Sequence, residues 1–217
     1  MKKDFFDIRV CIWDFDGTLY RAGEAFHNDI LETQYHLIMN HRGWEKKKAV
    51  EEFHKLYKVT TPSSTEVVSK LANVSIAQAA IEGEQINHRL KYIFRDEKLI
   101  QLFSTLSHHS HFILANGIKE NILPALVTLG VPYTTFIEIV TSEVVGVNKP
   151  QPEGFLYIME KTGLPAQQHL MIGDRDDVDL KPAKALGMRT CRVWTDKKSD
   201  VADITLPNVY EIANMLG

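Results

Sequence analysis

The stretch Trp13-Asp14-Phe15-Asp16-Gly17-Thr18-Leu19-Tyr20 decides how the rest of this chain is interpreted. It follows the run Arg9-Val10-Cys11-Ile12, which predicts a buried β-strand ending where the two aspartates begin. Side chains two residues apart on a strand share a face, so Asp14 and Asp16 are expected to be neighbours at its carboxyl end. Open α/β sheets bind ligands at that edge. Because Asp-Gly is also an ordinary turn signal, further segments are needed to show whether the pair is functional.

The composition is that of a globular protein. Of its 217 residues, 44% are hydrophobic and 24% are charged, and the formal net charge is -3. No basic field is available to attract nucleic acid, and the run Glu45–Lys48 predicts a solvated helix face. No stretch approaches the ~20 apolar residues of a membrane span. We therefore expect neither a nucleic-acid partner nor a membrane partner.

The cysteines and the N-terminal residues favour a cytoplasmic location. Cys11 and Cys191 both lie inside apolar runs, and two cysteines do not make a disulfide framework, so buried free thiols are expected. The segment Met1–Asp7 carries charges and no uninterrupted apolar core, so it does not read as a signal peptide. Both features fit a reducing compartment.

A long helical region follows the opening motif. Over residues 20–98 apolar side chains recur at helical spacing, and no run convincingly alternates at period two. Residues 60–64 predict a loop, and Ser63 with Glu66 three positions later has the spacing of a helix-capping box. A further helix is expected over residues 77–94. This region would form an all-helical cap above the paired aspartates.

From Leu99 onward, strand patterns alternate with helix patterns. Strands are expected at residues 112–115, 136–140, 169–172, 189–194 and 202–206, with helices at 121–129, 152–162, 180–186 and 208–216. Strands joined by single helices pair in parallel through right-handed crossovers. The predicted fold is therefore a Rossmann-like α/β core with helices on both faces of a parallel sheet. The core would comprise residues 1–19 and 99–217, and the cap residues 20–98.

Four polar segments fall where these strands end. They are Asp14 with Asp16, then Ala115-Asn116-Gly117, then Asn148-Lys149-Pro150, which is expected to open a helix, and finally Gly173–Asp179. A parallel sheet brings all four to one edge. Together they offer carboxylates, a lysine and backbone N–H groups, which suit a phosphoryl group bound with Mg²⁺.

In this order and spacing, the segments resemble those of the haloacid dehalogenase (HAD) superfamily. The resemblance rests on Asp14–Thr18, Asn116-Gly117, Lys149-Pro150, and Gly173-Asp174 with Asp179, and extends to Ile139–Ser142 and Lys184–Met188. It covers the first twenty residues and most of the chain from Leu99. The helical insert matches the family's helical cap in position and length but shares no sequence motif with it.

The resemblance implies a role for each matched residue. Asp14 would be the nucleophile that becomes an aspartyl-phosphate, and Asp16 the general acid and base. Mg²⁺ would be held by the Asp14 carboxylate, the Asp16 main-chain carbonyl and the Asp174 carboxylate. Lys149 would bridge the nucleophile and the phosphoryl oxygens. Asp179 would fix Lys149 or a metal-bound water.

The same resemblance narrows the activity and raises one question. Dehalogenases of the family lack an aspartate two residues beyond the nucleophile, so Asp16 favours a phosphatase for a small phosphorylated metabolite. A phosphomutase on the same core stays open. The family usually has Ser or Thr before the Asn116-Gly117 turn, where its hydroxyl binds a phosphoryl oxygen, and this chain has Ala115. A weakened enzyme, or a phosphate-binding regulatory protein without catalysis, is therefore a further alternative.

Several other polar and aromatic residues have an ordinary interpretation beside a functional one. The cluster His108, His109 and His111 could bind a metal, but a solvated connection before a strand is favoured. Asp176 and Asp177 are expected in a solvated turn, and insert aromatics such as Trp44 in the cap core. Two interpretations stay open for three further residues, which could lie at the surface or contribute to the site: Arg175, Tyr20 and Arg21.

Overall fold

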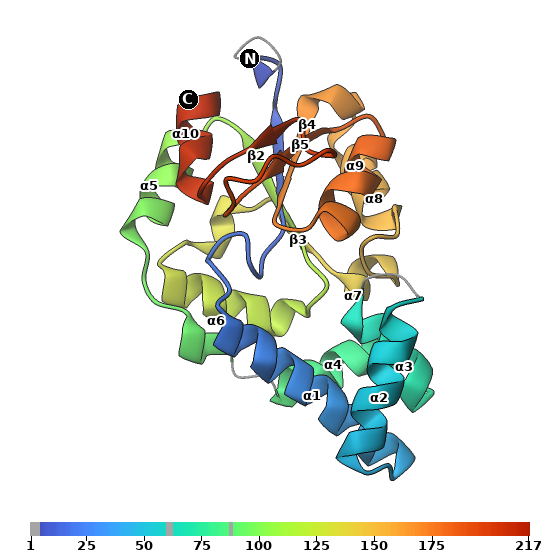
Figure 1. Ribbon diagram of the computed structural model, residues 1–217. Coiled ribbons are helices and arrows are strands. Elements are labelled where there is room, and N and C mark those ends of the chain that lie inside the picture. Colours follow the sequence, from blue (N-terminus) through green and yellow to red (C-terminus); the bar gives the residue numbers. More distant parts are fainter. Residues whose placement is uncertain (1–4, 60–62, 87–88) are drawn as a thin grey trace.

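A parallel six-stranded sheet runs through the computed structural model, which describes residues 5–59, 63–86 and 89–217 (Figure 1). The strand order is β3-β2-β1-β4-β5-β6, and each neighbouring pair is parallel. The strands are β1 (Val10–Trp13), β2 (Ser110–Leu114), β3 (Glu138–Val140), β4 (His169–Gly173), β5 (Arg189–Arg192) and β6 (Ile204–Thr205). The α/β fold expected from the sequence is confirmed.

Helices connect the strands and form the insert after β1. The insert contains α1 (Glu24–Arg42), α2 (Lys46–Tyr57), α3 (Ser64–Ala72), α4 (Ile76–Ile86) and the short η2 (Arg89–Tyr92). The remaining α-helices are α5 (Glu97–Thr105), α6 (Lys119–Leu129), α7 (Ser142–Val145), α8 (Glu153–Thr162), α9 (Lys181–Ala185) and α10 (Ile212–Leu216). Short turns of helix are η3 (Tyr133–Thr135), η4 (Ala166–Gln168), η5 (Asp176–Leu180) and η6 (Val209–Glu211).

Alternation along the strands builds a core on each face of the sheet. Trp13 and Ile113 point to one face, where they pack with apolar residues of α5, α6 and α10. Ile12 and Phe112 point to the other face and pack with residues of α8 and α9. Since neighbouring side chains on a strand face opposite ways, one short apolar strand supplies both layers.

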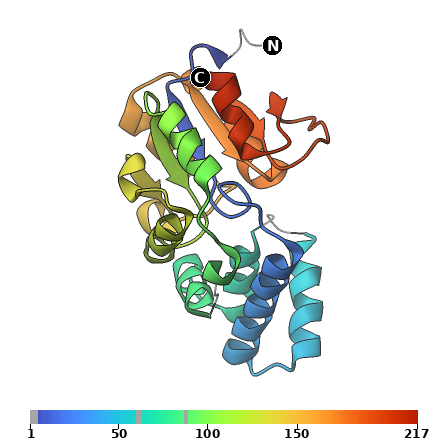
Figure 2. The same cartoon turned by 90° about the vertical axis from the view of Figure 1, so that its left-hand side faces the viewer.

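Helices α1 to α4 pack on one another through a separate apolar cluster, to which Tyr35, Ile38, Phe53 and Val67 belong. Figures 1 and 2 show these helices beyond one end of the sheet, while the C-terminal helix α10 lies at the opposite end of the molecule. The cluster explains why a helical pattern dominates the insert: each helix buries one stripe against the others.

Local signals explain several element ends, and two expectations were wrong. Ser63 caps α3, because its hydroxyl accepts a hydrogen bond from the N–H of Glu66; residues 60–62 of the expected loop lie outside the described residues. The helix expected over 77–94 is instead α4, ending at Ile86, and η2, with residues 87–88 outside the description. Lys149-Pro150 does not open a helix, because α8 begins only at Glu153. Proline disfavours helical geometry in the residue before it, so a turn precedes the helix.

The histidine cluster is only in part the solvated connection that its polarity suggested: His108 is exposed in the turn before β2, whereas His111 is buried. His111 lies in β2 with only 3% of its surface exposed. The Trp13 indole N–H donates to its Nδ1 at 3.1 Å, and its Nε2 lies 2.9 Å from the Leu106 carbonyl oxygen. Both ring nitrogens are thus satisfied inside the core, and His111 is a structural residue.

Candidate active site

The end of β1 carries the first two site residues. Asp14 is 3% exposed, and its backbone N–H donates to the Ile172 carbonyl at 2.9 Å, which extends the pairing with β4 by one residue. The chain then turns at Gly17, whose φ is +85°, and a Cβ there would lie 2.7 Å from an Asp174 oxygen. Glycine therefore lets the Asp16 loop pass close to Asp174. Strand β1 lies between β2 and β4, where the strand order reverses and α/β sheets bind ligands.

Lys149 lies between two buried carboxylates. Its Nζ is 2.7 Å from Oδ1 of Asp14 and 2.6 Å from Oδ1 of Asp179. The other Asp14 oxygen accepts a hydrogen bond from the Thr18 hydroxyl at 3.0 Å. Burial by itself would raise the pKa of Asp14, but the Lys149 ammonium outweighs burial and holds the pKa below its usual value. Burial likewise opposes the charge on Lys149, and the two carboxylates reverse that effect and raise its pKa.

Three carboxylates approach one another closely enough to hold a metal ion. One oxygen each of Asp14, Asp174 and Asp179 lies within 4.8 Å of the others. Oδ1 of Asp174 is buried and has no hydrogen-bond partner among the described residues; the Arg175 Nε is 3.8 Å away. Burial, together with the negative charges of Asp14 and Asp179, raises the pKa of Asp174 to about 7. An unpartnered carboxylate oxygen beside two further acids suits a hard divalent cation.

The side chain of Asn116 fixes the position of Lys149 through its main chain. Its side-chain N–H donates to the Lys149 carbonyl at 2.9 Å, and the Lys149 N–H donates to its side-chain oxygen at 2.8 Å. Neighbouring Ala115 directly follows β2 and is 6% exposed, and Ala115, Asn116 and Gly117 all line the same cavity as Asp14. Because the Asn116 amide already holds the main chain of Lys149, it is not free to replace a hydroxyl missing at Ala115.

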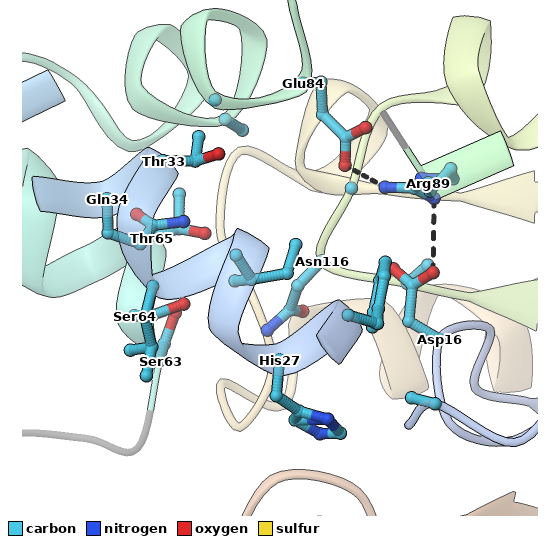
Figure 3. A pocket seen from close by; sticks show the side chains of 18 of the residues that line it. Asp16, His27, Thr33, Gln34, Ser63, Ser64, Thr65, Glu84, Arg89 and Asn116 are labelled. Atoms are coloured by element: carbon cyan, nitrogen blue, oxygen red, sulfur yellow. Dashed lines mark hydrogen bonds and ion pairs between the residues drawn. The ribbon is translucent and has the colours of Figure 1, made fainter. Parts of the chain in front are cut away.

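Asp16 is contacted from the helical insert by a residue that sequence reasoning missed. The Arg89 guanidinium, 3% exposed, lies 3.5 Å from an Asp16 oxygen and also pairs with Glu84 (Figure 3). The Tyr20 hydroxyl donates to the same Asp16 oxygen. No motif marks Arg89, which falls in a region of helical periodicity. Its contact with Asp16 arises from tertiary structure.

A cavity of about 460 Å³ joins the sheet edge to the helical insert. The sheet side contributes Asp14, Asp16, the turn after β2, Asp174 and Arg175, and the other side is lined by α1 to α4 and Arg89. Figure 3 shows Glu84, Arg89 and Asp16 linked at one end, with hydroxyl-bearing residues of the insert at the other. A small molecule bound here would contact both parts of the chain.

The other residues of the last polar segment divide between the site and the scaffold. The Arg175 N–H donates to Oδ2 of Asp179 at 3.1 Å, and Arg175 lines the cavity. Asp176 accepts hydrogen bonds from Arg192 and Ser199, so it anchors the loop rather than lying in a solvated turn. Asp177 pairs at the surface with Lys181, as a solvated residue should. Arg21 is exposed and is not among the residues that line the cavity.

In the part of the chain that the structure describes, no helix is both long enough and apolar enough to cross a membrane.

Comparison with known proteins finds one matching family and several related proteins. The model of the haloacid dehalogenase-like hydrolase family matches residues 11–193. Glyceraldehyde 3-phosphate phosphatase of Methanocaldococcus jannaschii is 33% identical over 109 residues, which are 48% of this chain and 47% of that protein. The chain thus aligns with less than half the length of that relative. The HAD-hydrolase YfnB of Bacillus subtilis is 26% identical over 95% of this chain and 92% of its own.

The fold has solved counterparts. A HAD phosphatase from Thermococcus onnurineus superimposes with a TM-score of 0.65 at 21% identity, over 97% of this chain and 98% of that chain. CbbY from Rhodobacter sphaeroides, solved in complex with phosphate, gives a TM-score of 0.64 at 16% identity, over 94% and 96%. At these identities the likeness concerns the fold.

Proposed function

The chain belongs to the haloacid dehalogenase-like hydrolases, and we propose that it is a Mg²⁺-dependent phosphatase that hydrolyses a small phosphorylated metabolite through an aspartyl-phosphate. One observation carries the proposal. The buried Asp14 carboxylate at the end of β1 is hydrogen-bonded to Lys149 and opens into a cavity that Asp16 also lines. The names of relatives in the family, such as glyceraldehyde 3-phosphate phosphatase, support a phosphate monoester as substrate.

In the first half of the proposed reaction, an Asp14 oxygen attacks phosphorus and the bond to the leaving oxygen breaks. Asp16 gives that oxygen a proton, so the product leaves as an alcohol. In the second half, Asp16 takes a proton from a water molecule, and the water oxygen attacks the phosphorus of the aspartyl-phosphate. Inorganic phosphate leaves and the Asp14 carboxylate is restored. The lowered pKa of Asp14 supports this role, since the carboxylate is ionised at neutral pH.

Lys149 and Asp179 would stabilise the charge of the transferred group. The Lys149 ammonium, 2.7 Å from the nucleophile, can also neutralise phosphoryl oxygens, and Asp179 holds that ammonium from its other side. The carboxylates of Asp14 and Asp174, with the main-chain carbonyl of Asp16, would hold Mg²⁺, which when bound polarises the phosphoryl group. The unpartnered buried oxygen of Asp174 supports this ligand set.

We also propose that residues 20–98 act as a cap on a core formed by residues 1–19 and 99–217. The separate apolar cluster of α1 to α4 and the cavity between these helices and the sheet edge support this division. The Arg89–Asp16 contact would join the cap to the catalytic loop when the site is closed. Closure of this kind excludes bulk water from a reactive intermediate.

Two experiments test the proposed activity. Release of inorganic phosphate from p-nitrophenyl phosphate should require Mg²⁺ and should fall by at least ~10³-fold in Asp14→Asn, whose amide is a poor nucleophile. A surface variant in the same acidic loop, Asp177→Asn, should keep full activity. If neither this ester nor a panel of phosphorylated metabolites is hydrolysed by folded protein, the phosphatase proposal is wrong. Activity unchanged in Asp14→Asn would reject the covalent mechanism.

A further inference from the structure

Two buried polar side chains of α1 have no side-chain hydrogen bond to any other described residue. Thr33 and Gln34 are 6% and 7% exposed, and both line the cavity. No side-chain hydrogen bond joins either of them to any part of the chain that the structure describes. Buried hydroxyl and amide groups nearly always have a hydrogen-bond partner, because leaving one without costs free energy. The polar atoms of Thr33 and Gln34 reach the cavity space, so a ligand that takes the place of water there would complete their hydrogen bonds.

The neighbouring lining has the same chemical character. Ser64 and Thr65 at the start of α3 add two hydroxyl groups to this wall of the cavity. Figure 3 shows them gathered with Thr33 and Gln34, away from the end that holds Arg89 and Asp16. Hydroxyl and amide groups both donate and accept hydrogen bonds and carry no charge. They therefore match uncharged polar groups, and hydroxyls in particular.

In the part of the cavity that the structure describes, both guanidinium groups already lie beside acidic side chains. Among the described lining residues there are two guanidinium groups, Arg89 and Arg175, and two imidazoles, His27 and His54. His27 lies 3.0 Å from the Gly23 carbonyl oxygen and His54 lies 2.9 Å from the Tyr35 hydroxyl, so each imidazole already has a partner. Arg89 lies between Glu84 and Asp16, so its charge is already matched twice. The Arg175 guanidinium lies at the sheet edge, where its Nε is 3.8 Å from Oδ1 of Asp174. A substrate carboxylate buried against Thr33 and Gln34 would meet no lysine or arginine there, and an unpaired buried charge is strongly disfavoured.

From this arrangement we infer that the leaving group of the substrate is an uncharged, hydroxyl-bearing molecule, so that the substrate is a polyol or sugar monophosphate. The inference rests on the proposed phosphatase activity and adds the substrate class. The phosphoryl group would lie at Asp14, and substrate hydroxyls would hydrogen-bond to Thr33 and Gln34. Hydrolysis breaks the phosphorus–oxygen bond, and the released oxygen takes its proton from Asp16, giving a neutral polyol and inorganic phosphate. Phosphorylated acids such as phosphoglycolate should be poorer substrates.

Pairs of substrates that differ by one carboxylate test the inference. Glyceraldehyde 3-phosphate and 3-phosphoglycerate form a three-carbon pair, and glucose 6-phosphate and 6-phosphogluconate a six-carbon pair. The neutral member of at least one pair should have a kcat/KM at least ~10-fold higher than its acid, as expected when a charge must be buried unpaired. If the acid of each pair is hydrolysed as well as or better than the neutral member, the inference is wrong.

Variants of the wall separate binding from chemistry. Thr33→Val and Gln34→Met should each lower kcat/KM for the preferred neutral substrate by about 3- to 10-fold, the worth of one neutral hydrogen bond. Hydrolysis of p-nitrophenyl phosphate, which has no hydroxyls to offer, should stay within about twofold. Thr128→Val, at a half-buried position on α6, and Gln101→Met, at an exposed position on α5, lie outside the cavity lining and are matched controls that should change neither activity.

A variant that adds a positive charge to this wall of the cavity gives a second test of the inference. Gln34→Lys should shift the ratio of kcat/KM toward the acid of each pair by about 10-fold, because the new ammonium can pair with its carboxylate. Equal loss on p-nitrophenyl phosphate and on the sugar phosphate in every wall variant would overturn the inference while leaving the phosphatase proposal intact. Failure of the wild-type protein to hydrolyse p-nitrophenyl phosphate or any metabolite overturns both.

Discussion

The side chain of Asn116 holds the main chain of Lys149 through two hydrogen bonds, one to its carbonyl oxygen at 2.9 Å and one from its N–H at 2.8 Å. The two residues follow different strands and are 33 positions apart in sequence. Their contact ties the turn after β2 to the loop that presents the lysine. The position of the Lys149 ammonium beside Asp14 therefore depends on Asn116.

Asn116→Ala should consequently lower kcat while leaving KM nearly unchanged. Loss of hydrogen bonds that leave backbone groups unpartnered costs about 1–3 kcal/mol, and a displacement of Lys149 of similar energy would slow catalysis by about 10- to 100-fold. Steady-state kinetics and urea unfolding measure the two effects. Asn214→Ala, on the exposed side of α10, is the control that should alter neither. A raised KM at full kcat would show that Asn116 binds substrate instead.

Lys149→Met should reduce stability as well as activity. It removes the single ammonium between Asp14 and Asp179, and an uncompensated buried charge is destabilising by about 3–5 kcal/mol. The double variant Lys149→Met/Asp179→Asn removes one of the stranded carboxylates, so it should recover stability without recovering activity. Denaturant unfolding with parallel phosphate-release assays separates the outcomes. The exposed Lys181→Met should leave both properties unchanged. Recovery of activity in the double variant would contradict a catalytic role for Lys149.

Much of the site could be predicted from the sequence, because the positions of its residues at one sheet edge follow from simple rules of strand pairing. Parallel pairing of β1 with β2 and with β4 brings the ends of these strands to one edge, and with them Asp14, Ala115 and Asp174. Arg89 could not be found in that way. Its contact with Asp16 depends on how the insert folds back over the sheet edge, and helical periodicity carries no information about that distance.

Mg²⁺ should bind more tightly as the pH rises through neutrality. With the pKa of Asp174 raised to about 7, its carboxyl is largely protonated at pH 6 and largely ionised at pH 8. Because the ligand must be ionised, the apparent Kd for Mg²⁺ should fall by about tenfold between these values. Mg²⁺ at about 100 times its Kd should add about 2.7 kcal/mol of stability, a rise in Tm of roughly 5–10 °C.

Calorimetric titration and thermal unfolding at both pH values measure this. Asp174→Asn should abolish the Mg²⁺-induced rise in Tm, and chelation by EDTA should reverse it in the wild type. Asp177→Asn, exposed in the same loop, is the matched control and should behave as the wild type. A rise in Tm that survives in Asp174→Asn would place the metal elsewhere.

Ala115→Thr should raise kcat/KM for a simple phosphate ester. The resemblance to the family places a hydroxyl at this position, and the Asn116 amide cannot substitute because it holds Lys149. A hydrogen bond to a charged phosphoryl oxygen is worth roughly 1.5–3 kcal/mol, which corresponds to about 10- to 150-fold. Ala115→Val has nearly the same shape without the hydroxyl, so it should give no gain. Equal activity of both variants and wild type would show that the site is already complete.

His111 shows why a polar cluster in a sequence can belong to the core. Its partners, the Trp13 indole and the Leu106 carbonyl, come from separate elements, and Trp13 is 98 positions away. The neighbouring sequence does not predict these partners, so a segment with three histidines in four residues was expected to be exposed to solvent. The buried ring is neutral because Nδ1 accepts from Trp13, which leaves the proton on Nε2 facing Leu106. A second proton on Nδ1 would oppose the Trp13 N–H.

The pH dependence of stability should therefore reveal His111. Burial lowers its pKa to about 4, below the unfolded value of about 6.5, so the unfolded chain binds more protons between these pH values. This contribution is fully present above pH 6.5 and is lost as the pH falls toward 4, by up to about 3 kcal/mol.

Burial also lowers the pKa of His169, so only a comparison of variants isolates His111. His111→Gln should give a flatter dependence of the unfolding free energy between pH 7 and 4.5, whereas His108→Gln, at an exposed position, should keep the wild-type slope. Equal slopes in all three proteins would mean that His111 accepts its second proton without cost, which the Trp13 contact forbids.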